Sequence, residues 1–133
     1  MALVLVDNGE KVALEYLVNK VTAQEDLTLK LFTSNTTPTD THTVTDYTEA
    51  TGNGYSSKSL TGASWTVSGT NPTTASYAEQ TFSFTGALGN TYGYYVIRTS
   101  TGDLLWAERF TDGPYNIQNN GDQIKVTLNI TMS

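Results

Sequence analysis

The sequence predicts an all-β protein, an antiparallel β-sandwich of jelly-roll or immunoglobulin-like topology, with one amphipathic helix near the N-terminus. Eight or nine short runs of strand-forming residues follow one another at a spacing of about 8 to 14 residues, with turn signals between them. Threonine, which is β-branched and favours strands, occurs 24 times in 133 residues. The third observation is the stretch 92–111, which has the pattern of a β-hairpin.

The stretch 92–111, YGYYVIRTSTGDLLWAERFT, holds two apolar runs on either side of STGD. A three-residue loop, with Gly102 at a positive φ angle, would set the register of the hairpin. The predicted facing pairs are Arg98 with Leu104, Ile97 with Leu105, Val96 with Trp106, Tyr95 with Ala107, Tyr94 with Glu108, and Tyr92 with Phe110. One face then carries Tyr92, Tyr94, Val96, Leu104, Trp106 and Phe110. The other carries Tyr95, Ile97, Leu105 and Ala107.

Both faces of this hairpin are therefore apolar, whereas a sheet with one solvated face should be apolar on the other face only. Something besides the facing sheet must cover the second face. The two candidates are the chain's own N-terminal helix and another subunit. We favour the helix because it is tethered to the same chain.

The N-terminal part of the chain predicts an apolar arm or short strand over 1–6 and a helix over 8–20, whose pattern is clearest from Gly9 to Lys20. Asp7, with Glu10 three residues later, resembles a capping box. The expected core-facing stripe at helical spacing is Ala13, Leu14, Leu17, Val18 and Val21.

The sandwich is expected to span 26–131 within a single domain, 1–133. Strands 26–32 and 123–131 alternate between apolar and polar residues, with Ile124, Val126, Leu128 and Ile130 directed inward. Asn120-Gly121 is a strong hairpin signal. Residues 33–51, which follow the first of these two strands, contain nine threonines in nineteen residues. A loop of this length is unusual unless it is functional, and 46–50 could form one helical turn within it.

Charge and composition exclude several classes of protein. The net charge is −6 with only seven Lys and Arg, which argues against binding nucleic acid or an anionic membrane surface. No apolar run approaches the roughly 20 residues of a membrane helix, and the first residues lack the pattern of a signal peptide. The chain has no cysteine, so disulfides and cysteine-based metal sites are excluded.

The residues that could carry catalysis are few, and we expect no catalytic residue, no metal and no cofactor. His42 is the only histidine. As a general base it would need an orienting carboxylate, for which Asp40 is a candidate, and a nucleophile nearby. A histidine in a solvated loop is the simpler interpretation. The acidic residues lack the spacing of a calcium loop.

The tyrosines allow a binding function rather than a catalytic one, because exposed aromatic rings could stack on sugars. They could equally anchor a protein interface or fill strand positions. A glycan- or receptor-binding β-sandwich is therefore the alternative function. The six tyrosines in question are Tyr55, Tyr77, Tyr92, Tyr94, Tyr95 and Tyr115.

Eight short blocks follow one another along the chain: TEA at 48–50, GY at 54–55, LTGASWT at 60–66, YAEQTFSF at 77–84, YGYYV at 92–96, LLWAERF at 104–110, DGPY at 112–115 and NNGDQIKVT at 119–127. In this order they resemble a group of small structural proteins encoded among the virion genes of tailed bacteriophages. The leading DNGEKVALEYLVNK is also similar to the start of that group. The resemblance covers nearly the whole chain and implies a capsid decoration (cement) protein, or a tail or fibre component.

The expected function is therefore non-enzymatic: stabilisation of the phage head by protein–protein contacts at the outer surface of the capsid, after synthesis in the host cytoplasm. The expected partners are the major capsid protein and copies of the chain itself. The general class of decoration proteins implies a homo-oligomer, most often a trimer. The candidate contact residues are Leu3, Leu5, Tyr92, Tyr94, Tyr95, Ile97, Leu105 and Trp106.

Overall fold

A computed structural model describes residues 3–18 and 25–132, and it is mostly β. The described elements, in chain order, are β1 (Val4–Leu5), α1 (Asp7–Leu17), β2 (Leu27–Phe32), β3 (Lys58–Leu60), β4 (Thr66–Ser68), β5 (Thr73–Ser83), β6 (Gly89–Thr91), β7 (Gly93–Arg98), β8 (Leu104–Arg109), β9 (Tyr115–Ile117) and β10 (Gln123–Met132). Short 3-10 helices lie at Val44–Asp46 and Gly62–Ser64. The predicted predominance of antiparallel strands, with one α-helix, is confirmed.

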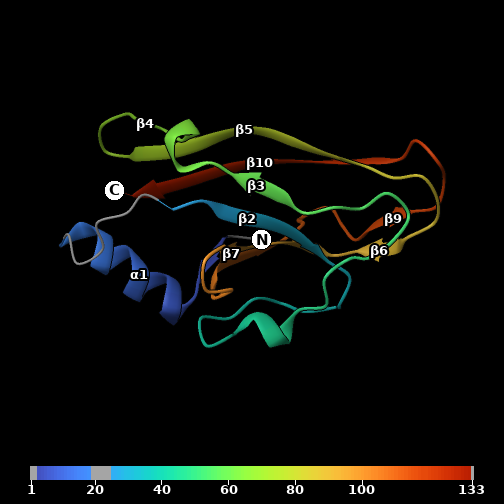
Figure 1. Ribbon diagram of the computed structural model, residues 1–133, viewed down its shortest axis with the longest axis horizontal. Coiled ribbons are helices and arrows are strands. Elements are labelled where there is room, and N and C mark those ends of the chain that lie inside the picture. Colours follow the sequence, from blue (N-terminus) through green and yellow to red (C-terminus); the bar gives the residue numbers. More distant parts are fainter. Residues whose placement is uncertain (1–2, 19–24, 133) are drawn as a thin grey trace.

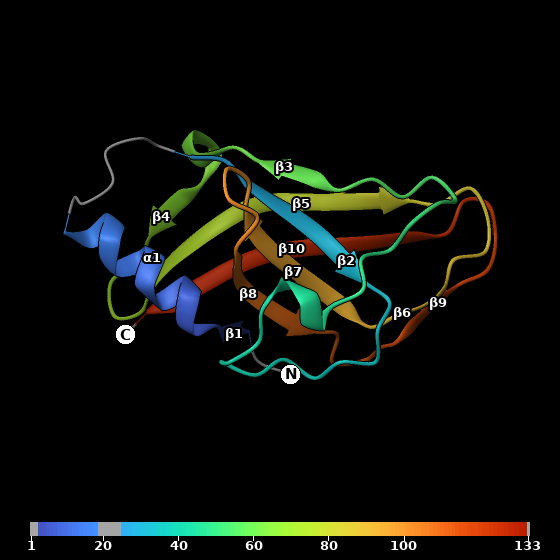
Figure 2. The ribbon, with the colours of Figure 1, turned by 60° about the horizontal axis from the view of Figure 1, so that its bottom comes forward.

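The strands form a five-stranded sheet in the order β1-β8-β7-β2-β3, a three-stranded sheet in the order β10-β5-β4, and the pair β6-β9. All of these pairings are antiparallel. Figure 1 shows β5 and β10 in one layer above β2 and β7, and Figure 2 shows the strands of the two layers crossing. The main core lies between the layers and draws on both, including Leu29, Leu31, Val96, Phe82, Val126 and Leu128.

The alternating strands follow the predicted pattern. In β10, Ile124, Val126 and Leu128 are buried and the residues between them are exposed. In β2, Leu29 and Leu31 are fully buried, but so is Phe32 on the opposite face. The sheet is therefore covered on both faces at this point, as the two-faced pattern of 92–111 implies.

The central hairpin consists of β7 and β8, and its predicted register is confirmed for three pairs: Tyr94 with Glu108, Tyr95 with Ala107, and Val96 with Trp106. Gly102 has the expected positive φ angle of 79°. The loop is one residue longer than predicted, because the Arg98 N–H donates to the Asp103 carbonyl at 2.9 Å. A shift at Leu105 compensates, so that Ile97 faces Leu104.

This bulge exchanges the faces of two leucines. Leu105 joins Trp106 in the main core, and Leu104 packs on the second face with Tyr95 and Ile97. Tyr92 also lies against the second face, in contrast to the prediction.

The second face of the hairpin is covered by the chain itself, but not by the helix. Its cluster consists of Val6, Phe32, Tyr47, Tyr95, Ile97, Leu104 and Ala107. Tyr47 comes from the threonine-rich loop, where its ring stacks on Tyr95 at a centroid distance of 5.4 Å and meets Phe32 edge-on at 4.9 Å. The loop is thus a structural cover, and its helical turn lies at Val44–Asp46 rather than at 46–50.

Helix α1 packs with a different face from the one predicted. Its buried residues are Gly9 and Val12, whereas Leu14, Leu17 and Val18 are exposed. A Cβ atom at Gly9 would lie only 2.1 Å from the Leu105 carbonyl oxygen, so this glycine allows α1 to approach β8. The predicted residues 19–20 and Val21 lie outside the described residues.

The start of α1 also differs from the prediction. Val6 occupies the N-cap position and there is no side-chain cap. Asp7 is the first helical residue, and its N–H donates to the Asp40 carbonyl at 2.9 Å. Residues Val4–Leu5 are a strand paired with β8 rather than a free arm.

Asn120-Gly121 forms a turn but not a hairpin. Strand β9 pairs with β6, while β10 pairs with β5. The turn is held by the Asp122 carboxylate, which accepts the N–H groups of Gln118 and Asn119 at 3.0 Å each. The chain therefore changes sheets at this turn instead of folding back on itself.

Candidate protein-contact surface

Five of the predicted contact residues belong to the interior. Tyr94, Tyr95, Ile97, Leu105 and Trp106 are each at most 8% exposed and pack within the chain. Leu3 and Tyr92 are partly buried, and Leu5 lies at the surface of β1 with 36% exposure. Most apolar side chains of the hairpin are therefore packed inside the protein.

Exposed apolar side chains gather instead on the outer side of α1. Leu14, Leu17 and Val18 are 60%, 77% and 69% exposed. Their spacing of three and four residues places them on one face of the helix, which we call the outer stripe. These three residues belong to the stripe that helical periodicity predicts to face the core. The helix forms as predicted, but this apolar face is exposed to solvent.

A second apolar feature lies on the inner side of α1, where the helix meets β1, β8 and the end of β10. This groove has a volume of about 430 Å³. Its lining is apolar and includes Leu3, Leu5, Val12, Tyr16, Trp106 and Met132. Six of the eight large hydrophobic residues that are exposed in the described part of the chain belong to the outer stripe or line the groove: Leu5, Leu14, Tyr16, Leu17, Val18 and Met132.

The sequence of α1 contains a second pattern at helical spacing, which predicts the observed orientation but is less hydrophobic than the outer stripe. Gly9, Val12, Ala13 and Tyr16 also recur at helical spacing. A glycine in a helix is unfavourable unless close packing requires it, and here it marks the inner face. The outer stripe contains the larger aliphatic residues, and hydrophobicity alone therefore favours the wrong face.

The tyrosine rings do not form a sugar-stacking platform. Tyr55 stacks on Phe82, Tyr77 meets Trp65, and Tyr115 packs on Phe110, with centroid distances of 5.9, 5.1 and 4.7 Å respectively. The Arg109 guanidinium covers Tyr92 at 4.9 Å. Of the eight tyrosines, all of which are described, only Tyr16 reaches 37% exposure.

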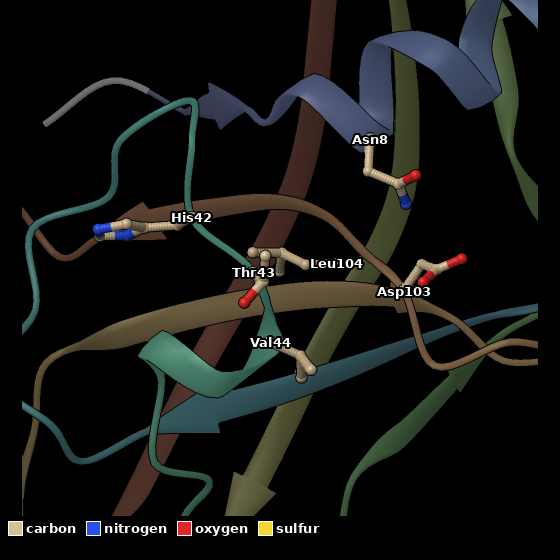
Figure 3. Close-up of a pocket in the computed structure, with 6 residues that line it drawn as sticks. All are labelled: Asn8, His42, Thr43, Val44, Asp103 and Leu104. Atoms are coloured by element: carbon tan, nitrogen blue, oxygen red, sulfur yellow. The ribbon is translucent and has the colours of Figure 1, made fainter.

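A small pocket of about 260 Å³ lies between the start of α1, the threonine-rich loop and the hairpin turn. Figure 3 shows Asn8 and Asp103 pointing toward each other at one end, while His42 points away from them. The Asn8 amide nitrogen has no hydrogen-bond partner among the described residues. This arrangement separates the histidine from the only carboxylate that lines the pocket.

The His42 ring has a structural partner. Its Nδ1 atom lies 3.0 Å from the Tyr47 hydroxyl, and the two rings meet edge-on. Burial raises the pKa of Tyr47 to about 12, so this hydroxyl stays protonated at neutral pH. The Asp40 carboxylate proposed from the sequence is not a partner of the ring, and the half-buried histidine instead braces the tyrosine that covers the hairpin.

Two arginines of the five-stranded sheet, Arg98 in β7 and Arg109 in β8, form hydrogen bonds to residues outside the strands. Arg98 donates to both carboxylate oxygens of Glu25, with the Nε bond at 2.5 Å and the Nη2 bond at 3.0 Å. This bidentate pair lowers the pKa of Glu25. Arg109 donates to the Thr36 carbonyl at 3.0 Å and to the Asn35 side chain at 2.7 Å, and so holds the threonine-rich loop.

Within residues 3–18 and 25–132, no group of three or more His, Asp or Glu side chains is arranged to hold a metal ion. None of the helices in those ranges is long and apolar enough to cross a membrane. Comparisons with protein-family models, curated proteins and solved structures found no match for this chain.

Proposed function

We propose that this protein is a non-enzymatic structural component of a tailed-phage virion, and that it decorates the outer surface of the capsid through protein–protein contacts. The resemblance of its sequence blocks to small phage structural proteins supports this role. The acidic composition suits a protein that must stay dissolved until it binds. The finer architecture that we propose is a β-sandwich of the jelly-roll or immunoglobulin-like kind.

The single observation that carries the proposal is the outer stripe of α1. Fully burying an aliphatic side chain of this size contributes roughly 1.5–3 kcal/mol, so Leu14, Leu17 and Val18 can together drive an association. Hydrophobic clusters of this kind, exposed on a monomer and bordered by charge, mark interaction sites. Glu10 and Lys11 border the stripe on α1 and are exposed.

Co-sedimentation with phage heads that lack this protein tests the proposal. The double variant Leu17→Ser/Val18→Ser should bind at least about tenfold more weakly, because two buried aliphatic contacts are lost. Val67→Ser is the matched control, since Val67 is 67% exposed on β4. Equal binding by the wild type and the double variant, or no binding by the wild type, would contradict the proposal.

The alternative function is that of a tail or fibre component whose β-sandwich binds a glycan or a receptor. Glycan binding requires coplanar, exposed aromatic rings beside polar groups, whereas seven of the eight tyrosine rings are packed against neighbours in the fold. This packing favours the decoration role.

A further inference from the structure

Strand β10 is an unusually long edge. It runs for ten residues, Gln123–Met132, and β5 is the only strand hydrogen-bonded to it in the described part of the chain. Figure 2 shows β10 with β5 on one side and no further strand of its own layer on the other. Over Lys125–Asn129 its outer edge therefore carries a row of backbone N–H and C=O groups available to another strand. The end of the strand, Ile130–Met132, lines the groove beside α1.

The edge lacks the features that usually keep such a strand from pairing. Monomeric proteins protect their edges with proline, several charges, a bulge in the edge strand or a very short strand. Strand β10 has no proline or glycine and one charged residue, Lys125. The irregularity between Val126 and Leu128 places the extra residue on β5, because the single residue Thr127 lies opposite two residues of β5, Ala78 and Glu79.

The sequence of β10 is complementary to itself when a second copy runs antiparallel to it. With Thr127 on a two-fold axis, Lys125 lies opposite Asn129 of the copy, and Val126 lies opposite Leu128. Apolar residues then meet apolar residues on the buried face, and polar residues meet on the exposed face. No like charges face each other, which matters because such pairs destabilise a sheet.

We propose that two copies of this chain pair through the outer edges of β10, around Thr127, to form a six-stranded sheet with the order β4-β5-β10-β10-β5-β4. Each copy presents the same surface to the other, as a two-fold interface requires. The two-fold pairing differs from the trimer that the general class of decoration proteins implies. It uses neither the outer stripe nor capsid binding, so it stands independently of the proposed function.

Charge substitutions on the two-fold axis test the pairing. Thr127 is exposed, so Thr127→Lys and Thr127→Glu each place two like charges opposite each other in a homodimer. Sedimentation equilibrium should show a wild-type dimer at tens of micromolar and dimers weakened on the order of tenfold or more in each variant. An equimolar mixture of the two variants should restore the dimer, because Lys then faces Glu.

Thr66→Lys and Thr66→Glu are matched controls, since Thr66 is an exposed threonine of β4 in the same sheet. They should dimerise as the wild type does. A monomeric wild type, dimers unaffected by the Thr127 variants, or no recovery on mixing would each overturn the proposal.

Amide hydrogen exchange on the unmodified chain provides a test that does not depend on whether the variants fold. Backbone amides on the outer edge of Lys125–Asn129 should exchange slowly at high protein concentration and rapidly on dilution. Amides that bond β5 should remain protected at both concentrations. Exchange at the outer edge that is independent of concentration would overturn the pairing.

Discussion

At the scale of single residues, the fold depends on side chains that come from loops. Tyr47 is 7% exposed although it lies in a loop of threonines, and it closes the second face of the hairpin. Strand periodicity predicts that this face needs a cover, but it cannot identify one, because a single aromatic residue in a loop has no periodic signal. His42 and Tyr95 contact Tyr47 from two sides.

Tyr47→Ala should lower the free energy of unfolding by about 3 kcal/mol, in the range measured for large aromatic truncations in cores. The loss has two causes. The truncation leaves a cavity next to Phe32 and Tyr95, and it removes the hydroxyl that pairs with the His42 ring. Tyr16→Ala is the control, since Tyr16 is 37% exposed. Urea denaturation measures both, and equal losses would show that the loop does not act as a cover.

Asp122 makes the turn before β10 sensitive to pH. The N–H groups of Gln118 and Asn119 hold the pKa of this carboxyl below its ordinary value of 3.8. A lowered folded-state pKa means that the stabilisation is complete at neutral pH and is lost as the pH falls through the folded-state pKa.

Asp122→Asn should therefore lower the melting temperature at pH 7, and the difference from the wild type should narrow as the pH falls below 3.8 and through the folded-state pKa, because the wild-type carboxyl then also becomes protonated. Thermal melts followed by circular dichroism across this range measure the difference. A gap that stays constant with pH would mean that the carboxylate charge does not hold the turn.

At the scale of elements, local pattern predicts strands better than it predicts what packs on them. The alternation in β2 and β10 depends only on which residues face the core, and it is visible in the sequence. The bulge at Leu105 is not visible in the sequence, because it accompanies a hairpin loop that is one residue longer than the predicted three-residue loop. The prediction of the packed face of α1 is also wrong, because it follows the largest apolar residues. The contact of α1 with β8 is set instead by Gly9, which has no side chain.

Gly9→Ala tests how α1 is positioned. Alanine favours helix formation more than glycine does, yet its Cβ would meet the Leu105 carbonyl oxygen at 2.1 Å. The variant should lose about 1–3 kcal/mol of stability through overpacking. Glu10→Ala, at the neighbouring exposed position, should change stability by less than about 0.5 kcal/mol. Stabilisation by Gly9→Ala would show that α1 does not lie against β8.

At the scale of the whole molecule, the chain covers its own hairpin and leaves other apolar surface open. The outer stripe lies on α1, and the long free edge belongs to β10, so the two surfaces can contact different partners. The sequence predicts an excess of apolar surface in a small acidic protein. It does not predict where that excess is exposed, because this depends on long-range contacts of the threonine-rich loop and of Gly9.

The central claim is that this protein contacts its partner through α1 rather than through the hairpin. Hydroxyl-radical footprinting of the protein, free and bound to phage heads that lack it, tests this claim most directly. The account predicts that Leu14, Leu17 and Val18 become protected on binding, while Val67 keeps the reactivity of the free protein. Unchanged reactivity along α1 in the bound protein would contradict the account.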